Sequence, residues 1–249
     1  MTTHTEASLV TGGASGLGRA ICLRLAARGD LVTVADRDEA GVAATADLIT
    51  AAGGRARSVT LDVTDADAVR QAVAEADAEL PLTTAVACAG IALPTSVLDP
   101  DLSGFDRTLA VNVRGSYAVV QAAATVMLPR RSGSIVTIGS TSSFTASSTP
   151  MLAYDMSKAA VRMLTQAAAR ELGPHGIRVN GVAPGTMDTP LMRGLGADDA
   201  GLSTLAAARI PLGRLGLPAE VAEAVAFASS AEASYLTGQM LVVDGGWLA

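Results

Sequence analysis

The chain has 249 residues, a length that suits one α/β domain (1–249) with a single core. Hydrophobic residues make up 49 % and charged residues 17 %, so disorder is not expected. The formal net charge is −6 and no basic cluster extends beyond Arg130-Arg131, which argues against nucleic acid or an anionic membrane as partner. No export signal is found at the start and no apolar run reaches the ~18 residues of a membrane span, so we expect a cytoplasmic protein.

A short apolar run at residues 7–12 breaks into a glycine-rich turn, and a helical pattern follows from Arg19 to Arg28. Glycines let a backbone adopt positive φ and approach a ligand, and free N–H groups at a helix N-terminus can bind an anion such as pyrophosphate. The spacing is Gly-x3-Gly-x-Gly, so a tight turn without a ligand is the alternative. The expected contacts are Gly12, Ser15, Gly16, Leu17 and Gly18.

The next strand, residues 31–36, ends in Asp36, eighteen residues past Gly18. A carboxylate there can accept hydrogen bonds from the adenosine ribose hydroxyls and repel a 2′-phosphate, which predicts NAD as cofactor and makes NADP the alternative. Arg37 could stack on adenine or meet a 2′-phosphate. Asp36 could instead cap the helix expected at 38–52, although Asp38 is better placed for that role.

Strands and helices continue to alternate along the chain. Further strands are expected at 56–61, 82–88, 133–140, 177–183 and 239–243, and helices at 65–79, 109–128, 153–172 and 218–229. Polar or glycine residues recur at the carboxyl ends of the strands, where an open parallel sheet binds ligands. Asp62 could accept from the adenine amine while Val63 packs on the ring, or Asp62 could cap a helix. Cys22 and Cys88 lack metal-ligand spacing, so we expect free thiols and no metal site.

The helix at 153–172 places Tyr154 and Lys158 on one face, four residues apart. Lys158 is the only lysine, in a chain whose other basic residues are arginines. An ammonium beside a phenol favours the phenolate, which makes the tyrosine a candidate general base; an ordinary surface pair is the alternative. Asn112, in the apolar helix at 109–128, could hold a water or a kink, or be a satisfied core asparagine.

Together these motifs resemble the short-chain dehydrogenase/reductase family over essentially the full length. The matching residues are Thr11-Gly12-x3-Gly16-x-Gly18, Asp62-Val63, Asn112, Ser140, Tyr154-x3-Lys158, Pro184-Gly185 with Thr189, and Asp244-Gly245-Gly246. Cys88-Ala89-Gly90 departs from the usual Asn-Ala-Gly, which removes an amide that steadies the central sheet. The Ser140–Tyr154 spacing is one residue longer than is most common, so Ser142 is kept in reserve.

The resemblance implies a single-domain, Rossmann-type doubly wound sheet of about seven parallel strands with helices on both faces. Tyr154 would be the catalytic acid/base, and Lys158 would lower its pKa and hold the nicotinamide ribose. Ser140 would polarise the carbonyl, and Asn112 would support a water that links Lys158 to solvent. The further cofactor contacts would be Ala89, Gly90, Pro184, Gly185, Met187 and Thr189. The two apolar helices would form a homotetramer, with a homodimer as the alternative.

The function expected from these residues is NAD(H)-dependent interconversion of a secondary alcohol and a ketone. A non-catalytic dinucleotide-binding sensor or scaffold is the alternative. A stretch at 186–212 is a candidate lid. The expected pocket residues are Ser142, Phe144, Met151, Leu191 and Met192, in two candidate pocket segments at 141–152 and 186–195. Arg193 is the one cation in these pocket segments, which favours a neutral, moderately apolar substrate.

Overall fold

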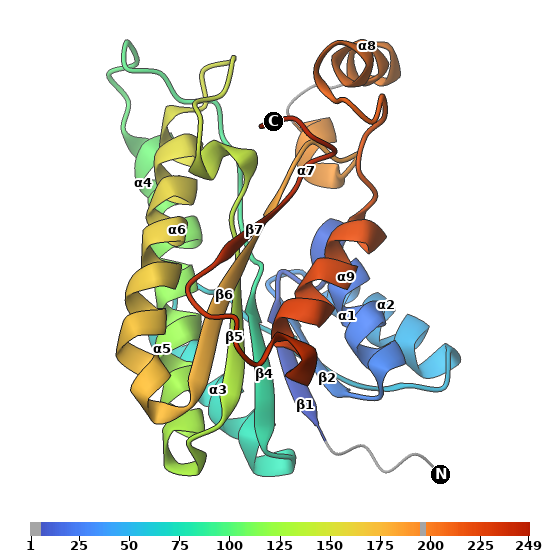
Figure 1. Ribbon diagram of the computed structural model, residues 1–249, viewed down its shortest axis with the longest axis vertical. Helices are drawn as coiled ribbons and strands as arrows, with labels where there is room; N and C mark the ends of the chain where they lie inside the picture. The colour runs from blue at the N-terminus through green and yellow to red at the C-terminus, as the bar shows by residue number, and fades with distance from the viewer. Residues whose placement is uncertain (1–5, 195–197) are drawn as a thin grey trace.

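The computed structural model describes residues 6–194 and 198–249. Its strands are β1 (Ala7–Thr11), β2 (Leu31–Asp36), β3 (Arg55–Thr60), β4 (Leu82–Ala87), β5 (Gly133–Ile138), β6 (Ile177–Pro184) and β7 (Met240–Val243). Within the described residues these seven strands form one parallel sheet in the order β3-β2-β1-β4-β5-β6-β7 (Figure 1). The chain starts in the middle of the sheet, runs to one edge, returns beside β1 and runs to the other edge, which confirms the predicted doubly wound fold.

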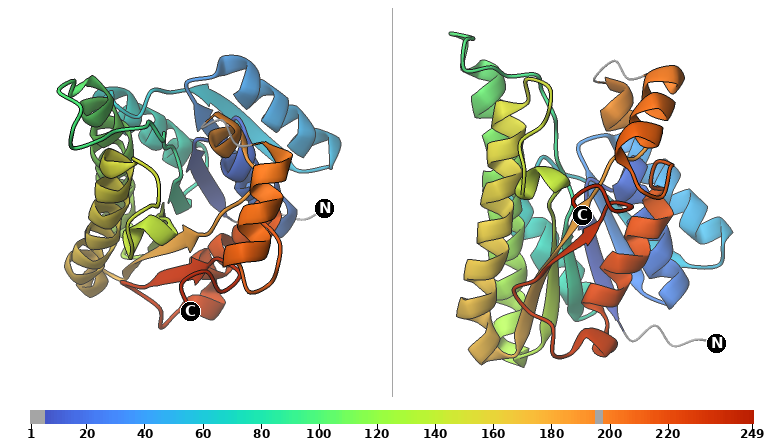
Figure 2. Two further views of the ribbon diagram at one scale, coloured as in Figure 1. Left: turned by 90° about the horizontal axis from the view of Figure 1, so that it is seen from above. Right: turned by 45° about the horizontal axis from the view of Figure 1, so that its top comes forward.

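Helices cover both faces of the sheet (Figures 1 and 2). One face carries α3 (Ala66–Glu79), α5 (Ser116–Met127) and α6 (Leu152–Leu172), and the other carries α1 (Gly16–Arg28), α2 (Glu39–Ala51) and α9 (Pro218–Ser229). Successive strand residues point to opposite faces, so Leu9 of β1 packs in the first core and Val10 in the second. Burial on both faces explains why these strands read as continuous apolar runs.

The helix predicted at 109–128 differs from the observed one. The helical stretch begins earlier, with α4 (Ser103–Leu109), and passes through a π-helical segment, Ala110–Gly115, before it becomes α5. Asn112 lies inside the π-helical segment, and its backbone carbonyl accepts a hydrogen bond from the Ser116 hydroxyl at 2.7 Å. The irregular turn therefore surrounds the one amide side chain that the sequence marked as unusual in this helix.

The stretch at 186–212 contains two helices, α7 (Pro190–Gly194) and α8 (Asp199–Arg209), and residues 195–197 of it lie outside the described residues. The Asp198 side chain caps α8 by accepting a hydrogen bond from the Gly201 N–H at 2.7 Å. Both helices stand beyond the carboxyl end of the sheet (Figure 1). The sequence did not predict them, because a short, capped surface helix carries little hydrophobic periodicity.

Two loops meet where the strand order reverses, between β1 and β4. The Thr11 hydroxyl oxygen at the end of β1 accepts hydrogen bonds from the N–H groups of Cys88 (3.2 Å) and Ala89 (3.3 Å), which follow β4. In an open α/β sheet this reversal opens a crevice for a ligand. Both cysteines are free thiols, as expected. Over the described ranges, no helix is both long and apolar enough to cross a membrane.

Candidate active site

A cavity of about 1270 Å³ lies at the carboxyl end of the sheet. Its walls come from the turn after β1, the ends of β2, β4, β5 and β6, the start of α6, and the α7–α8 stretch. Pockets for one small ligand usually measure about 300–1,000 Å³, so this cavity has room for a dinucleotide and a small substrate together. All the expected cofactor contacts named above line it.

The glycine turn forms a cradle that fits a pyrophosphate. Gly12 has φ of +75°, and a Cβ there would lie 2.9 Å from the Cα of Ala89. Gly16 also has positive φ, +50°, and begins α1 with Ser15 as an N-cap that makes no side-chain hydrogen bond. The first turn of α1 has no acidic residue, so its free N–H groups and positive dipole end face the cavity unopposed.

Two carboxylates, Asp36 and Asp62, line the cavity where the adenosine is expected. Asp36 accepts hydrogen bonds from the N–H groups of Ala14 and Asp38, each at 3.2 Å, which ties the end of β2 to the glycine turn. The capping alternative fails for Asp36, because Asp38 caps α2 through the Gly41 N–H.

Asp62 does not cap a helix either, since Asp65 caps α3. Hydrogen bonds from the Thr64 N–H (2.9 Å) and the Thr64 hydroxyl (2.8 Å) lower the pKa of Asp62, and the charges of Arg37 and Arg107 act in the same direction. Both arginines line the cavity. The role of Asp62 in binding adenine stays a prediction.

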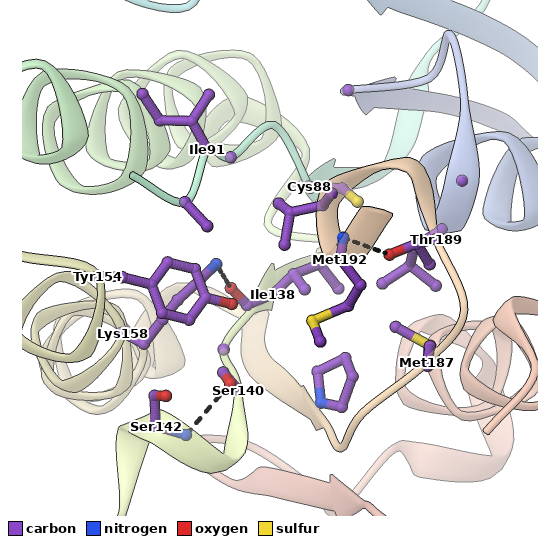
Figure 3. A pocket seen from close by; sticks show the side chains of 18 of the residues that line it. Cys88, Ile91, Ile138, Ser140, Ser142, Tyr154, Lys158, Met187, Thr189 and Met192 are labelled. Carbon is purple, nitrogen blue, oxygen red and sulfur yellow. Dashed lines mark hydrogen bonds between the residues drawn. The ribbon is translucent and has the colours of Figure 1, made fainter. Parts of the chain in front are cut away.

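The first turns of α6 bring Tyr154 and Lys158 to the inner end of the cavity (Figure 3). The Lys158 Nζ lies 5.6 Å from the centroid of the Tyr154 ring and donates a hydrogen bond to the Ile138 carbonyl at 2.8 Å. Burial lowers the pKa of Lys158 to about 8, while the Cys88 thiol nearby opposes this shift. The lysine is thus an internal charge held against the end of β5, and the surface-pair alternative is wrong.

The expected lowering of the Tyr154 pKa is not found. Burial raises the pKa of this phenol, a hydrogen bond with Ser140 offsets part of the rise, and Asp155 adds to it. Lys158 does not counter the rise, because its ammonium is turned to the Ile138 carbonyl and its own charge is disfavoured by burial.

Ser140 and Ser142 both line the cavity, at the start of a 3₁₀ turn that follows β5. The Ser140 hydroxyl oxygen accepts a hydrogen bond from the Ser142 N–H at 3.1 Å, and the Ser140 side chain acts to lower the pKa of the Tyr154 phenol. Ser143 anchors the turn to α6 by donating to the Lys158 carbonyl at 2.8 Å. Ser140 is therefore the serine that meets Tyr154, whereas Ser142 pairs with Ser147 at 3.3 Å.

Asn112 lies beneath the cavity and is fully buried. Its Nδ2 donates to the Ile91 carbonyl and to the Ser157 hydroxyl, both at 2.9 Å, and its Oδ1 accepts from the Ile91 N–H at 2.8 Å. The amide thus fixes the loop after β4 against the helix that carries Tyr154. Asn112 is thus a core asparagine with its hydrogen bonds satisfied, and it lies in an irregular part of the helix. A role in binding a water stays a prediction.

The substrate end of the cavity differs in part from expectation. Met151, Leu191 and Met192 line it, but Phe144 lies outside, where its ring packs 4.4 Å from the Arg162 guanidinium. Arg193 also lies outside the wall and pairs with Asp188 and Asp199, each at 2.7 Å. The wall instead includes a different group that the sequence did not single out, namely Ile91, Thr145, Ser147, Leu205, Arg209 and Trp247. Thr145 and Ser147 lie in the predicted pocket segment 141–152, and Leu205 and Arg209 lie in the predicted lid stretch, but spacing along the chain could not show which side chains of these stretches line the cavity.

Comparison with known proteins agrees with this geometry. A family model described as enoyl-(acyl carrier protein) reductase matches residues 12–248. The cis-4-hydroxycyclohexanecarboxylate dehydrogenase of Sinomonas cyclohexanicum is 41 % identical, over 97 % of this chain and 96 % of its own. The crystal structure of a short-chain type dehydrogenase/reductase from Mycobacterium marinum is 38 % identical with a TM-score of 0.92, covering 98 % of this chain and 96 % of its own.

A second solved structure bears on the cofactor. A proposed NAD(P)-dependent gluconate 5-dehydrogenase from Beutenbergia cavernae, with NADP bound at low occupancy, is 37 % identical with a TM-score of 0.91. The similarity covers 98 % of this chain and 97 % of that one. With the family model and these relatives matching almost its whole length, the chain belongs to the short-chain dehydrogenase/reductase family.

Proposed function

We propose that this chain catalyses the NAD(H)-dependent interconversion of a secondary alcohol and a ketone, with Tyr154 as the general acid/base. The observation that carries the proposal is the meeting of Tyr154, Ser140 and Lys158 at the inner end of a cavity whose other end is a pyrophosphate cradle. These three side chains and the glycine turn support the catalytic interpretation over the non-catalytic alternative.

In the oxidation direction the phenol oxygen of Tyr154 takes the proton of the substrate hydroxyl, and in reduction it returns that proton. Ser140 would donate a hydrogen bond to the same substrate oxygen and hold it within reach of Tyr154. A nicotinamide bound in this cavity would supply the hydride chemistry. Lys158 would hold the nicotinamide ribose, and its ammonium beside the ring would favour the ionised phenol.

Burial of Tyr154 and Lys158 has a chemical purpose in this proposal. A phenol with a raised pKa is a reluctant base, whereas a nearby cation has more effect in a site from which water is excluded. Lys158, with a pKa of about 8, remains mostly protonated at neutral pH. The buried Asn112 joins Ile91, in the loop after β4, to Ser157 of α6, and thereby fixes the helix that carries Tyr154 and Lys158.

The preference for NAD over NADP rests on Asp36. Its carboxylate is fixed by two backbone N–H groups at the end of β2, where a 2′-phosphate would meet a like charge. Arg37 and Arg107 line the same end and would favour a phosphate, and the Beutenbergia relative carries NADP. We expect Asp36 to outweigh them, because its carboxylate is held in place.

The expectation of a neutral substrate needs revision. It rested on Arg193 as the one cation near the pocket, and Arg193 is paired with two carboxylates outside the wall. Arg209 takes its place in the wall. For assembly we keep the homotetramer, because α5 and α6 expose apolar side chains, with Tyr117 52 % and Met163 62 % exposed.

The test is a panel of secondary alcohols and ketones, assayed by NADH absorbance in parallel with NAD(H) and NADP(H). We expect turnover of at least one pair, and a kcat/KM for NAD(H) about 10- to 100-fold above that for NADP(H), since one repelled phosphate costs roughly a charged hydrogen bond. An absence of hydride transfer across the panel would contradict the proposed reaction, and a preference for NADP(H) would contradict the role of Asp36.

A further inference from the structure

The substrate end of the cavity has one charged side chain outside the catalytic group. The charged residues in the described wall are Asp36, Arg37, Asp38, Asp62, Arg107, Lys158 and Arg209. Five of them lie at the expected adenosine end, where Arg37 and Arg107 act on Asp62, and Lys158 lies beside Tyr154. Arg209 stands apart, on α8, and Leu205 one turn earlier faces the same cavity.

Arg209 rests on a fixed aromatic platform. Its guanidinium carbon lies 5.6 Å from the centroid of the Trp247 ring, and Trp247 is the only tryptophan of the chain. The turn that carries Trp247 is held by Asp244, which accepts hydrogen bonds from the N–H groups of Gly246 and Leu248, both at 2.9 Å. Stacking occupies one face of a guanidinium and leaves the N–H donors in its plane free for an anion.

Arg193, in the same stretch at 186–212, is an arginine whose charge is balanced by ion pairs. It makes ion pairs with Asp188 and Asp199 and is not part of the cavity wall. Among the described residues, Arg209 has no side-chain carboxylate within ion-pair distance, and its guanidinium lies over the Trp247 ring. An exposed guanidinium in a pocket wall, with N–H donors that no side-chain carboxylate occupies, can bind an anionic ligand.

We propose that Arg209 recognises a carboxylate on the substrate, so that the enzyme acts on a secondary alcohol or ketone that also carries a carboxylic acid. The inference rests on the proposed function and names the substrate class of that same site. The carboxylate binds the planar N–H donors of Arg209 above Trp247, while the reacting carbon lies at Tyr154 and Ser140. The wall between them supplies hydroxyls at Thr145 and at Ser147, which Asp155 fixes through hydrogen bonds of 2.8 and 2.6 Å.

A phosphate of the dinucleotide is the other anion that enters this cavity. It has its own cradle at the first turn of α1, and two further arginines lie at the expected adenosine end. Arg209 is therefore assigned to a substrate carboxylate. The KM for the cofactor distinguishes this assignment from binding of a cofactor phosphate.

The experiment compares three keto acids with their methyl esters: 3-oxobutanoate, 4-oxopentanoate and 4-oxocyclohexanecarboxylate. Each pair is assayed with NADH on the wild type, Arg209→Gln, Arg209→Lys and Arg55→Gln. Arg55 is a matched control, because it is an exposed arginine of β3 outside the cavity wall. Binding is followed independently by Trp247 fluorescence, with the keto acid titrated into the NADH complex of Tyr154→Phe, with and without Arg209→Gln.

We expect at least one acid to be preferred to its ester by the wild type, and Arg209→Gln to raise the KM for that acid about 10- to 100-fold, the value of one charge-assisted contact. Arg209→Lys should recover part of the loss, and the KM for NADH and the ester rates should stay within about twofold of the wild type. Arg55→Gln should behave as the wild type.

Equal use of acids and esters by the wild type would overturn the proposal, as would an equal loss on both in Arg209→Gln. A raised KM for NADH in that variant would assign Arg209 to the cofactor phosphates instead. If no ketone is reduced, the proposed reaction fails, yet the fluorescence titration still decides this inference: saturable binding of a keto acid that Arg209→Gln abolishes supports it, and no binding contradicts it.

Discussion

Two walls of one cavity are built in opposite ways. The glycine turn at 12–18 is held by backbone contacts: Gly18 is buried, and a Cβ on it would overlap the Gly12 carbonyl oxygen. In the stretch at 186–212, apart from residues 195–197, Arg193 makes surface ion pairs with Asp188 and Asp199, while Met187, Leu202, Ala206 and Ile210 are buried. The first wall therefore tolerates almost no change in shape, while exposed positions of the second, such as Arg209, can change without disturbing the core. We infer that cofactor binding is set by the first and substrate choice by the second.

The largest effect is expected when one methyl group is added to the glycine turn at 12–18, which tests whether this wall is rigid. Gly18→Ala forces a Cβ into the Gly12 carbonyl, so we expect a loss of about 1–3 kcal/mol in the free energy of unfolding, as in overpacked cores. The affinity for NADH should fall as well, because the turn must open. Denaturant unfolding and NADH fluorescence titration measure the two effects.

Gly173→Ala is the matched control for that change. Gly173 has φ of −55° and ψ of −45°, and a Cβ there would meet nothing within 4 Å. Alanine should reduce the number of unfolded conformations but is less favourable than glycine in α backbone before Pro174, so we expect a change of less than about 1 kcal/mol in the free energy of unfolding and no change in NADH affinity. If both alanine variants behave alike, the turn is not as tightly constrained as described.

A smaller effect is expected in the pH dependence of stability, where the buried Lys158 can be compared with the exposed Arg193. The pKa of Lys158 is lowered from 10.5 to about 8 by burial, so between these pH values the unfolded state binds more protons than the folded state. Stability contributed by this residue is therefore lowest below pH 8 and increases as the pH rises toward 10.5. Relative to Lys158→Met, the wild type should gain on the order of 1 kcal/mol in the free energy of unfolding over that window.

Arg193→Gln serves as the control for this pH series. The two carboxylates beside Arg193 raise its pKa further above its already high value, so it stays charged throughout the range. Its removal should leave the pH dependence of stability unchanged between pH 8 and 10. If the free energy of unfolding changes with pH in the same way in the wild type and in Lys158→Met over this range, Lys158 is not held as a buried charge.

The sequence predicted the sheet well, because strands buried on both faces keep their apolar, β-branched pattern. The predicted ends of the seven strands lie within about two residues of the observed ends, and all the predicted cofactor contacts line one cavity. The π-helical segment around Asn112 could not be predicted, because it depends on Ile91 and Ser157 meeting the same amide.

The surroundings of individual side chains were harder to predict from the sequence than the strands. Phe144 lies in a predicted pocket segment but turns to Arg162, and Arg209 and Trp247 meet only because α8 and the turn after β7 fold together. The pKa of Tyr154 depends on burial, which spacing along a helix cannot report. Local backbone geometry can thus be read from residue order, whereas the direction of a side chain depends on packing between distant segments.

The most direct test of the account is to remove the Tyr154 hydroxyl. On the best substrate of the panel, Tyr154→Phe should lower kcat about 10²- to 10⁴-fold, the usual contribution of a general acid/base, while NADH still binds. Tyr235→Phe is the control, because Tyr235 is fully exposed and outside the cavity wall, and it should retain full activity. Undiminished turnover by Tyr154→Phe would contradict the proposed chemistry.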